Sequence, residues 1–362
     1  MVSPTNAKNV ERRFRLCLLG DVSLNGRWST DEECRLFVPE VQEMIAGHDA
    51  VLLNLESPIR GDGRENLLKN PRLSTCAKAI EKLECLRPRV CVLGNNHVYD
   101  HLELGFKRTL EAVKSLGAIP VGAGLTLLEA REPARFELNG SSVSVLAYTG
   151  AETNPNLRDD AGVFLNMIEP DRMLQEVQRE SESGRFIVVS LHWGEEYYRF
   201  PAPWQRRLAT SLVDAGADVI WGHHAHVCQG WERVRDSYVL YCLGNSVFDD
   251  VEGAPKWSKL GKESLCVSVS DCSGPSRARD LDVRLVRRIT AVDPGEFAAT
   301  EELERVLCQA FRWPAFVYGV FYGLVRAQSL LKRVRYFFFG DGRNPWEQIV
   351  RLPSRVWKAL VR

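Results

Sequence analysis

The sequence predicts a layered α/β or mixed α+β fold, and three features of the chain predict it. Short apolar runs alternate with segments whose apolar residues recur at helical spacing. The runs "DAVLLNL" and "RFIVVSLHW" are apolar at successive positions, which is typical of strands covered on both faces. Two pairs of apolar runs are separated by turn residues, Asn139-Gly140 and Asp236-Ser237, and each pair is expected to form a hairpin. Such a pattern favours stacked layers of helix and sheet.

The expected elements follow one another along the first 250 residues. Strands are predicted at 14–19, 50–55, 89–93, 118–122, 143–148, 186–192, 218–221 and 238–243. Helices are predicted between them, at about 31–46, 74–86, 102–116, 170–182 and 203–215. The two hairpins pair 134–138 with 143–148 and 231–235 with 238–243. Residues 270–280, which are rich in small polar side chains, are expected to form a loop.

The composition changes near residue 298, and this change predicts the domain organisation. Residues 1–13 are expected to be a disordered N-terminus, residues 14–298 the layered domain, and residues 299–362 a helical, aromatic and basic extension. From residue 305 onward the chain carries eleven Lys or Arg and two acidic residues, although its net charge is zero. The basic charge is therefore concentrated in the C-terminal extension.

The last residues predict a basic helix face. Arg351, Arg355, Lys358 and Arg362 recur at the spacing of one side of a helix, although Pro353 interrupts the pattern. A basic amphipathic helix is typical of segments that bind a membrane surface or a partner, such as a membrane-bound synthase. The alternative is a helix packed on its own domain with a solvated basic face.

Composition and cysteine usage favour a soluble protein of a reducing compartment. The chain is 45% hydrophobic and 26% charged, which is ordinary for a globular protein, and its zero net charge gives no indication of nucleic-acid binding. The ten cysteines form no C-x-x-C pair, and several lie in strand-like runs, as buried free thiols do. The N-terminus lacks the apolar core of a signal peptide, and no apolar stretch reaches the roughly 18–20 residues of a membrane span. We expect a cytoplasmic protein, peripherally attached to a membrane if its tail binds lipid.

Polar donors follow six of the predicted strands. In layered α/β folds functional side chains gather beyond the carboxyl ends of strands, so six such ends in succession predict one shared polar site. Taken singly, these residues have structural alternatives, such as a helix cap for Asp21 or a core imidazole for His192. The blocks are "GDVSLNGR" with Asp21 and Asn25, "NLESP" with Asn54 and Glu56, "GNNHVYD" with Asn95, Asn96, His97 and Asp100, "HWGEEY" with His192, Glu195 and Glu196, "GHHAH" with His223, His224 and His226, and "GNSVFDD" with Asn245.

The donor types indicate a metal site. Carboxylate, carboxamide and imidazole groups, with no thiolate in any of these loops, suit Mn, Fe or Zn, and two divalent ions more readily than one. Two ions joined by a bridging carboxylate clamp the attacking and leaving oxygens of a displacement at phosphorus or carbon. A histidine beside the metals can then protonate the leaving group. On an extended turn, His224 and His226 are expected to point to one face and His223 to the other.

The order of these blocks resembles the calcineurin-like metallophosphoesterase superfamily, and most closely its capsule-synthesis branch, the CapA or poly-γ-glutamate biosynthesis family. The stretches "NLESPI", "GNNHVYD", "GFKRTLEAVKSLGAIPVGAGLTLLEAREP", "HWGEEY", "GHHAHVCQGWE" and "YCLGNSVFD" carry the resemblance, over residues 14–250. It implies a β-sandwich flanked by helices. It also implies two divalent metal ions held by Asp21, Glu56, Asn96, His192, His224 and His226, with His97 as the proton-transfer residue.

Two departures from the superfamily pattern bear on the activity. Ser23 stands where the first motif usually has a histidine, and Glu56 stands where the bridging residue is usually Asp. The resemblance implies a metal-dependent enzyme that acts on, or helps assemble, an anionic or amide-linked polymer such as poly-γ-glutamate. The alternatives are a phosphomonoesterase or phosphodiesterase using the same site on a small phosphoester, and a non-catalytic scaffold for a membrane-bound polymer synthase. Candidate substrate-binding residues are Asn25, Arg27, Asn95, Asp100, Glu195, His223 and Asn245. Glu196 is a further candidate, although Arg27, Glu195 and Glu196 could equally form a salt network at the rim, and His223 could be structural.

Overall fold

The first strand shows how the core is built. In the computed structural model of the chain, which describes residues 12–339 except 252–255, 273–278, 289–292, 302–303 and 305–306, β1 (Arg12–Val22) is buried on both faces. Leu16 and Leu18 belong to one apolar cluster, whereas Cys17 and Leu19 belong to another. Because side chains alternate along a strand, β1 lies between two apolar layers.

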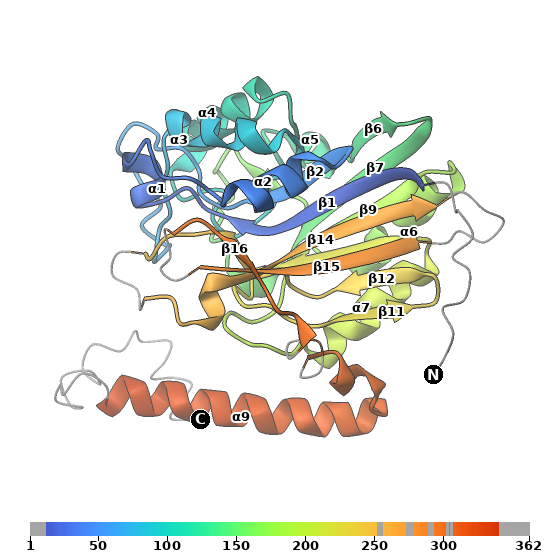
Figure 1. Cartoon of the computed structure of the whole chain (residues 1–362). Helices are drawn as coiled ribbons and strands as arrows, with labels where there is room; N and C mark the ends of the chain where they lie inside the picture. The colour runs from blue at the N-terminus through green and yellow to red at the C-terminus, as the bar shows by residue number, and fades with distance from the viewer. Residues whose placement is uncertain are drawn as a thin grey trace. The chain divides into compact units, whose positions relative to one another are not determined.

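The first of two sheets contains β1 (Figure 1). Its strand order is β16-β15-β14-β1-β2-β3-β4, with β13 paired to β1 outside this path. The strands β1 to β4 are parallel neighbours, and β14 to β16 continue the sheet in antiparallel pairs. The other strands are β2 (Ala50–Leu55), β3 (Pro88–Val92), β4 (Ile119–Val121), β13 (Asn245–Val247), β14 (Glu263–Cys272), β15 (Arg279–Arg287) and β16 (Glu296–Ala298).

The second sheet has the order β11-β12-β10-β9-β7-β6. Its centre is parallel, and its two ends are the hairpins β6–β7 and β11–β12, which confirms both hairpin predictions. The strands are β6 (Ala134–Leu138), β7 (Ser141–Thr149), β9 (Phe186–His192), β10 (Val219–His223), β11 (Trp231–Val234) and β12 (Ser237–Leu240), and a separate short pair joins β5 (Ala123–Gly124) to β8 (Phe164–Leu165).

The two sheets pack face to face. One apolar cluster contains Leu16 of β1 together with Val188 of β9 and Trp221 of β10, so its side chains come from both sheets. The indole Nε1 of Trp221 donates to the backbone carbonyl of Leu19, with an N–O distance of 2.9 Å. This hydrogen bond ties the carboxyl end of β10 to that of β1, and the two strand ends therefore deliver their following loops to the same place.

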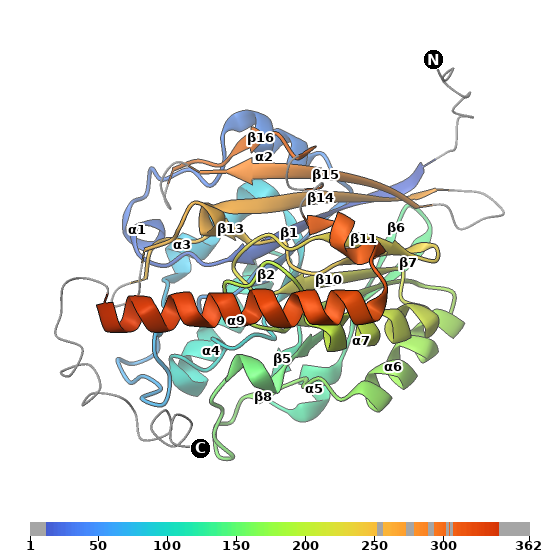
Figure 2. The same ribbon diagram turned by 90° about the horizontal axis from the view of Figure 1, so that it is seen from below.

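Helices cover the outer faces of the sandwich. Trp28, Val41, Ile80 and Phe106, from α1, α2, α3 and α4, pack in the apolar cluster on the outer side of the first sheet. On the second sheet, α6 packs on β9 and α7 on β10, and the two helices lie side by side (Figure 2). The helices are α1 (Arg27–Thr30), α2 (Pro39–Ala46), α3 (Ala77–Glu81), α4 (Leu102–Ser115), α5 (Leu127–Arg131), α6 (Pro170–Glu182) and α7 (Pro203–Asp214), and the 3-10 turns are η1 (Lys82–Leu86), η2 (Ala151–Thr153), η3 (Leu260–Lys262) and η4 (Gln309–Arg312). The predicted helix-flanked β-sandwich is confirmed.

Two predicted elements are wrong in part. The helix expected over 31–46 begins only at Pro39, because proline suits the first turn of a helix and Phe37 instead bridges to Gly295. The loop expected over 270–280 is strand at both ends, within β14 and β15, and residues 273–278 lie outside the described part of the chain. Apolar and polar residues alternate in "SLCVSVS" and "LDVRLV", so the sequence did carry a signal for these two strands.

The chain divides into two compact units, Met1–Phe311 and Arg312–Arg362. The second unit contains α9 (Ala315–Phe339), and the ring of Trp313, which precedes this helix, packs edge-on against Phe321 at a centroid distance of 5.0 Å. Among the described residues, no helix is long and apolar enough to cross a membrane. The predicted basic face at 351–362 and residues 1–11 of the predicted disordered N-terminus lie outside the described residues.

Candidate metal centre

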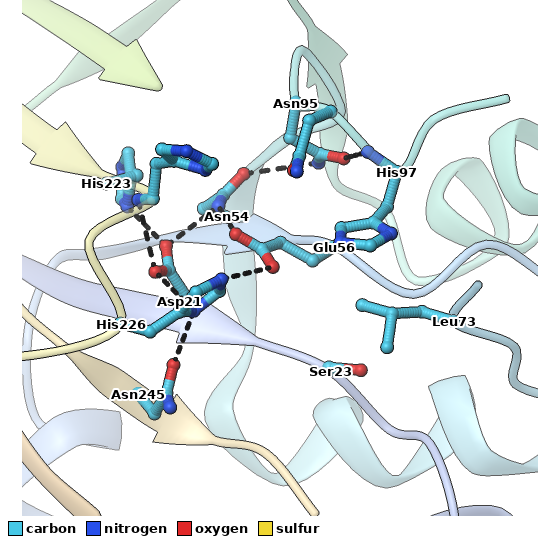
Figure 3. Close-up of polar contacts among 12 residues, drawn as sticks. Asp21, Ser23, Asn54, Glu56, Leu73, Asn95, His97, His223, His226 and Asn245 are labelled. Atoms are coloured by element: carbon cyan, nitrogen blue, oxygen red, sulfur yellow. Dashed lines mark hydrogen bonds and ion pairs between the residues drawn. The ribbon is translucent and has the colours of Figure 1, made fainter. Parts of the chain in front are cut away.

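Asp21, at the end of β1, is the centre of a buried polar network (Figure 3). One carboxylate oxygen, Oδ1, accepts a hydrogen bond from Asn54 at 2.9 Å and lies 3.0 Å from Nδ1 of His223. The other, Oδ2, accepts from the backbone N–H of His224 at 3.2 Å and lies 3.4 Å from Nδ1 of His226. Burial alone would raise the pKa of the Asp21 carboxyl. The hydrogen bond from His223 and the nearby imidazoles lower this pKa by more than burial raises it, so Asp21 favours its charged form.

Glu56 brings a second carboxylate to Asp21 from the residue after β2. Its Oε1 accepts from Asn54 at 3.2 Å, and its Oε2 lies 3.8 Å from Nε2 of His226, beyond hydrogen-bond distance. Within the described part of the chain, Oε2 is a buried oxygen without a hydrogen-bond partner. Burial and the charge of Asp21 together raise the pKa of Glu56 well above its usual range. A buried carboxylate oxygen with no donor is suited to a cation.

Two further imidazoles, those of His192 and His224, complete the network. His192 ends β9, and its Nε2 lies 3.1 Å from Nδ1 of His224 and 2.9 Å from Oδ1 of Asn96. Burial, followed by the neighbouring imidazoles, lowers the pKa of His192 well below its usual range, and burial lowers the pKa of His224 to about 3. Both rings are therefore neutral at pH 7, which is the form that binds metal ions.

The loop after β10 differs from the expected extended turn. His224 and His226 have φ values of 86° and 55°, in the left-handed region that non-glycine residues rarely adopt. The loop therefore does not alternate its side chains between two faces, and His223 does not point away from the site as predicted. Instead His223 is fully buried, bound to Asp21 and packed edge-on against Trp221 at a ring distance of 4.4 Å.

His97 lies beside the carboxylates, on the loop after β3. Its Nδ1 is 2.6 Å from Oδ2 of Asp100, which also accepts from the backbone N–H of Leu73 at 2.7 Å. The backbone N–H of His97 donates to the side chain of Asn95 at 3.1 Å. Burial lowers the pKa of His97, although the charge of Asp100 opposes this shift. Since Asp100 engages Nδ1, Nε2 is the nitrogen left for proton transfer.

A small cavity of about 100 Å³ opens beside this network. His97 and His226 form part of its wall, so the polar network is accessible to a small ligand. The full set of lining residues is Lys69, Asn70, Pro71, Leu73, His97, Glu196, Tyr197, His226, Phe248, Val251 and Trp257.

Two groups of side chains have ligand atoms close enough to hold a cation. Asp21, Glu56 and His192 form one group, and Glu196 forms the other with His224 and His226. Within each group the ligand atoms lie within 4.8 Å of one another. The oxygen and nitrogen donors in both groups fit the borderline ions expected from the sequence.

The six predicted metal ligands and His97 lie together in the structure. Several of the predicted substrate-binding residues instead hold other side chains or loops of the site in place. Oδ1 of Asn245 accepts a hydrogen bond from Nδ1 of His226 at 2.9 Å, and Asn95 donates to the carbonyl of Leu55 at 2.8 Å, so both hold neighbouring groups in place. Asn25 braces its own loop, accepting from the hydroxyl of Ser23 at 2.9 Å.

The remaining predicted substrate ligands lie outside the cavity wall. Arg27 is not brought to the ligand groups: its side chain is 62% exposed and pairs with Asp31 at 3.0 Å. Glu195 is half-buried and, unlike its neighbour Glu196, is not part of the cavity wall.

Three residues of the site were not predicted as metal ligands. The sequence placed Asn54 and Glu196 among the strand-end donors, and it gave no indication of Lys69. Asn54, which donates to both Asp21 and Glu56, stands two positions before Glu56, and this spacing along an extended segment was a usable signal. Glu196 stands next to Glu195 in the same motif, so only the directions of their side chains distinguish the two residues. Lys69 lies in an irregular loop far from every motif, and no pattern in the sequence pointed to it.

A helix-flanked pair of sheets that brings carboxylates, a carboxamide and imidazoles together at its strand ends defines a protein with a candidate metal centre at one edge of a sandwich. The family model described as bacterial capsule synthesis protein PGA_cap matches residues 15–250, and the chain belongs to this family. The family prediction drawn from the order of the strand-end blocks is therefore confirmed.

Curated relatives of the chain have names that refer to capsule, PGA or polyglutamine synthesis. The capsule biosynthesis protein CapA of Bacillus anthracis is 29% identical over 262 residues, covering 68% of this chain and 62% of the relative. The PGA biosynthesis protein CapA of Bacillus subtilis is 30% identical and covers 58% of this chain and 56% of the relative. A probable polyglutamine synthesis accessory protein of Mycobacterium tuberculosis is 32% identical, with 57% of each chain covered. The chain thus spans about three fifths of the length of these relatives.

Solved structures with similarity to the chain include two nucleotidases. A 5'-nucleotidase precursor from Thermus thermophilus has 15% sequence identity and a TM-score of 0.44, covering 84% of this chain and 59% of its own. The NAD nucleotidase of Haemophilus influenzae has 10% identity and a TM-score of 0.45, covering 82% of this chain and 62% of its own.

Proposed function

We propose that the chain is a metal-dependent hydrolase of capsule synthesis that acts on an anionic or amide-linked polymer such as poly-γ-glutamate. The observation that carries this proposal is the convergence of two ligand groups, Asp21-Glu56-His192 and Glu196-His224-His226, beside one small cavity. The unpartnered oxygen of Glu56 supports the presence of a cation, because that oxygen is buried and nothing described donates to it.

The residues that would hold two divalent ions, Mn, Fe or Zn, are contributed by five strand ends. Such ions would polarise the scissile carbonyl or phosphoryl group and lower the pKa of a water molecule that attacks it. Asp21 keeps its charge for this role, and His192 and His224 keep their neutral form, so the donors are in the protonation states that ions require. The proposed ligands are Asp21, Glu56, Asn96, His192, His224 and His226, together with Glu196, which the sequence indicated as a possible substrate-binding residue.

His97 is the proposed general acid. It lines the cavity, and Asp100 holds its Nδ1, so the ring is oriented with Nε2 toward the substrate side. A proton given from Nε2 to the leaving amine or alcohol would neutralise the charge that develops when the bond breaks. Asp100 would stabilise the ring while that proton is still bound, as a carboxylate does for a paired imidazole.

The first experiment measures bound metal by elemental analysis of purified protein. The wild type should carry about two ions of Mn, Fe or Zn per chain, and the double variant His224→Ala/His226→Ala should lose them. A matched control is His48→Ala, since His48 lies outside the site and bonds to Met44 and Ser268. A wild type that takes up none of the three ions after reconstitution would exclude the metal-dependent mechanism.

Substrate screening then separates the proposal from a second candidate, a phosphomonoesterase or phosphodiesterase that uses the same site. The two adjacent ligand groups favour this candidate as well, since paired ions suit phosphoryl transfer. Hydrolysis of γ-glutamyl amides without turnover of aryl phosphates would support the polymer hydrolase, and the reverse result would support the phosphoesterase.

A non-catalytic scaffold for a membrane-bound polymer synthase is the third candidate. The name of the mycobacterial relative, an accessory protein, favours it. The expected signature is a protein that binds no metal yet co-sediments with anionic vesicles or with the synthase, and does so only while residues 313–362 are present. Metal binding together with turnover in the isolated chain would exclude it.

A further inference from the structure

Lys69 places a positive charge in the wall of the cavity. Its side chain is buried, with 5% of the residue exposed, and Nζ donates to the backbone carbonyl of Asn154 at 3.1 Å. It lines the cavity together with His97, Glu196 and His226. A lysine that is mostly buried is unusual, because removing an ammonium group from water is costly unless an anion compensates it.

The loop that carries Lys69 is hydrogen-bonded to Asp100, the residue that holds the proposed general acid His97. The backbone N–H of Asn66 donates to the carbonyl of Asp100 at 2.9 Å, and the backbone N–H of Leu73 donates to the Asp100 carboxylate at 2.7 Å. The side chain of Asn66 also donates to the carbonyl of Asn156 at 3.2 Å. Lys69 is therefore positioned by the same residue that positions His97.

The charge on Lys69 has no paired carboxylate among the described residues, and its one hydrogen bond goes to a neutral carbonyl. Burial lowers the pKa of Lys69, while the more distant charges of Asp100, Glu196 and Glu56 oppose that shift. An ammonium group has three N–H donors, and the carbonyl of Asn154 takes one. Donors and charge thus remain for an anion that enters the cavity.

We propose that Lys69 is the substrate-recognition residue of this site and binds a carboxylate or phosphate group of the substrate beside His226 and His97. This inference rests on the proposed function, because it assumes that the cavity is where substrate binds. A carboxylate would come from a γ-linked glutamyl polymer, whose residues keep their α-carboxylates free, and a phosphate would come from a phosphoester.

The size and walls of the cavity indicate how such a substrate enters. A cavity volume of about 10–15 Å³ holds one water molecule. The cavity of about 100 Å³ therefore admits a carboxylate or phosphate group but not several residues of a polymer. The rings of Trp257 and His226 lie 5.3 Å apart, and Tyr197, half exposed at the rim, lies 5.8 Å from Trp257. One anionic group would therefore be bound inside while the rest of the chain crosses the aromatic rim.

The test is equilibrium binding by titration calorimetry on the full chain treated with a chelator, so that metal does not contribute. Three probes are used: a γ-glutamyl tetramer, the same tetramer with its α-carboxylates amidated, and inorganic phosphate. The variants are Lys69→Met, the charge-keeping Lys69→Arg, and the control Lys78→Met, since Lys78 is an exposed lysine paired with Glu32. Lys69→Gln, which keeps an N–H donor, replaces Lys69→Met if that variant does not fold.

The wild type should bind one of the two anionic probes, and Lys69→Met should weaken that binding at least tenfold while Lys69→Arg and Lys78→Met stay within about threefold. Preference for the free-carboxylate tetramer over its amide identifies the polymer, and preference for phosphate identifies a phosphoester. Equal binding by wild type and Lys69→Met, or equal binding of the tetramer and its amide without phosphate binding, would overturn the proposal. Metal content is measured in parallel. A wild type that binds no metal counts against the proposed hydrolase. Anion binding by Lys69 is judged on the titrations alone.

Discussion

Replacing Glu56 by Gln should raise the stability of the metal-free protein and lower the stability of the metal-bound protein. The ligand atoms of Asp21, Glu56 and His192 lie within 4.8 Å of one another. Two carboxylate charges at that separation repel by about 3 kcal/mol at an effective dielectric constant of about 20. Glu56→Gln keeps the shape and the contact with Asn54 but removes one of the two charges. This repulsion of about 3 kcal/mol sets the scale of the gain in the metal-free protein when both carboxyls are ionised.

The gain should depend on pH. The pKa of Glu56 is raised in the folded protein above its ordinary value of 4.5, so the folded state holds a proton that the unfolded state has lost. The free energy of unfolding of the wild type should therefore fall as pH rises above about 4.5, until the folded carboxyl also ionises. Gln has no such proton, so the stability difference between variant and wild type should be near zero at pH 4.5–5 and grow toward about 1–3 kcal/mol at pH 8.

The measurement is urea denaturation of chelator-treated protein at both pH values, repeated with saturating Mn. Bound metal at about 100 times its Kd should stabilise the wild type by about 2.7 kcal/mol, and the Gln variant should lose most of this. Glu180→Gln is the matched control, because Glu180 is also a buried glutamate but is paired with Arg135 at 2.7 Å, which keeps its pKa low against the effect of burial. Glu180→Gln should destabilise the protein at pH 8, and less so as pH falls. A Glu56→Gln variant that is less stable than wild type at pH 8, or a difference that is the same at both pH values, would refute the reasoning.

Two further predictions follow from the site and its supporting strand. His97→Asn should lower the turnover of any substrate found by about 10²–10⁴-fold while leaving metal content unchanged, and unchanged turnover would remove His97 from proton transfer. Gly222→Ala should destabilise the protein by about 1–3 kcal/mol or more, because an added Cβ would lie 1.9 Å from the carbonyl oxygen of Tyr241. Gly319→Ala, in α9 with nothing within 4 Å of the new Cβ, is its control and should stabilise that helix by about 0.5–1 kcal/mol. Thermal denaturation compares the two glycine variants, and a Gly222→Ala melting temperature equal to that of wild type would contradict the predicted clash.

Much of the site was predictable because its signals are local. Asp21 and His192 stand at the ends of buried strands, and Glu56 directly follows one. His97 and the imidazoles after β10 lie in the loops just beyond two others. Parallel strands place their carboxyl ends at one edge, so the sequence alone indicates that the side chains after them meet. The same reasoning placed Asn54 among the strand-end donors, on the same segment as Glu56, although no specific role was predicted for it.

Other features depend on contacts between distant parts of the chain. Lys69 reaches the cavity because its loop bonds to Asp100 and to the carbonyl of Asn154, and neither partner can be inferred from the residues around Lys69. His223, the last residue of β10, faces Asp21 because it lies on the same side of the strand as Trp221, whose indole bonds to β1. His224 and His226 follow with left-handed backbone angles, which no periodicity indicates.

The sequence by itself determined the family, the layered fold and the donor types at the strand ends, since strand periodicity and the residue that follows each strand are local properties. Only the tertiary structure decided which of two adjacent glutamates, Glu195 or Glu196, faces the imidazoles, and which cation faces the cavity. The physical reason is that a site of this kind is assembled across two packed sheets, where the direction of each side chain is set by contacts that are far apart in the sequence.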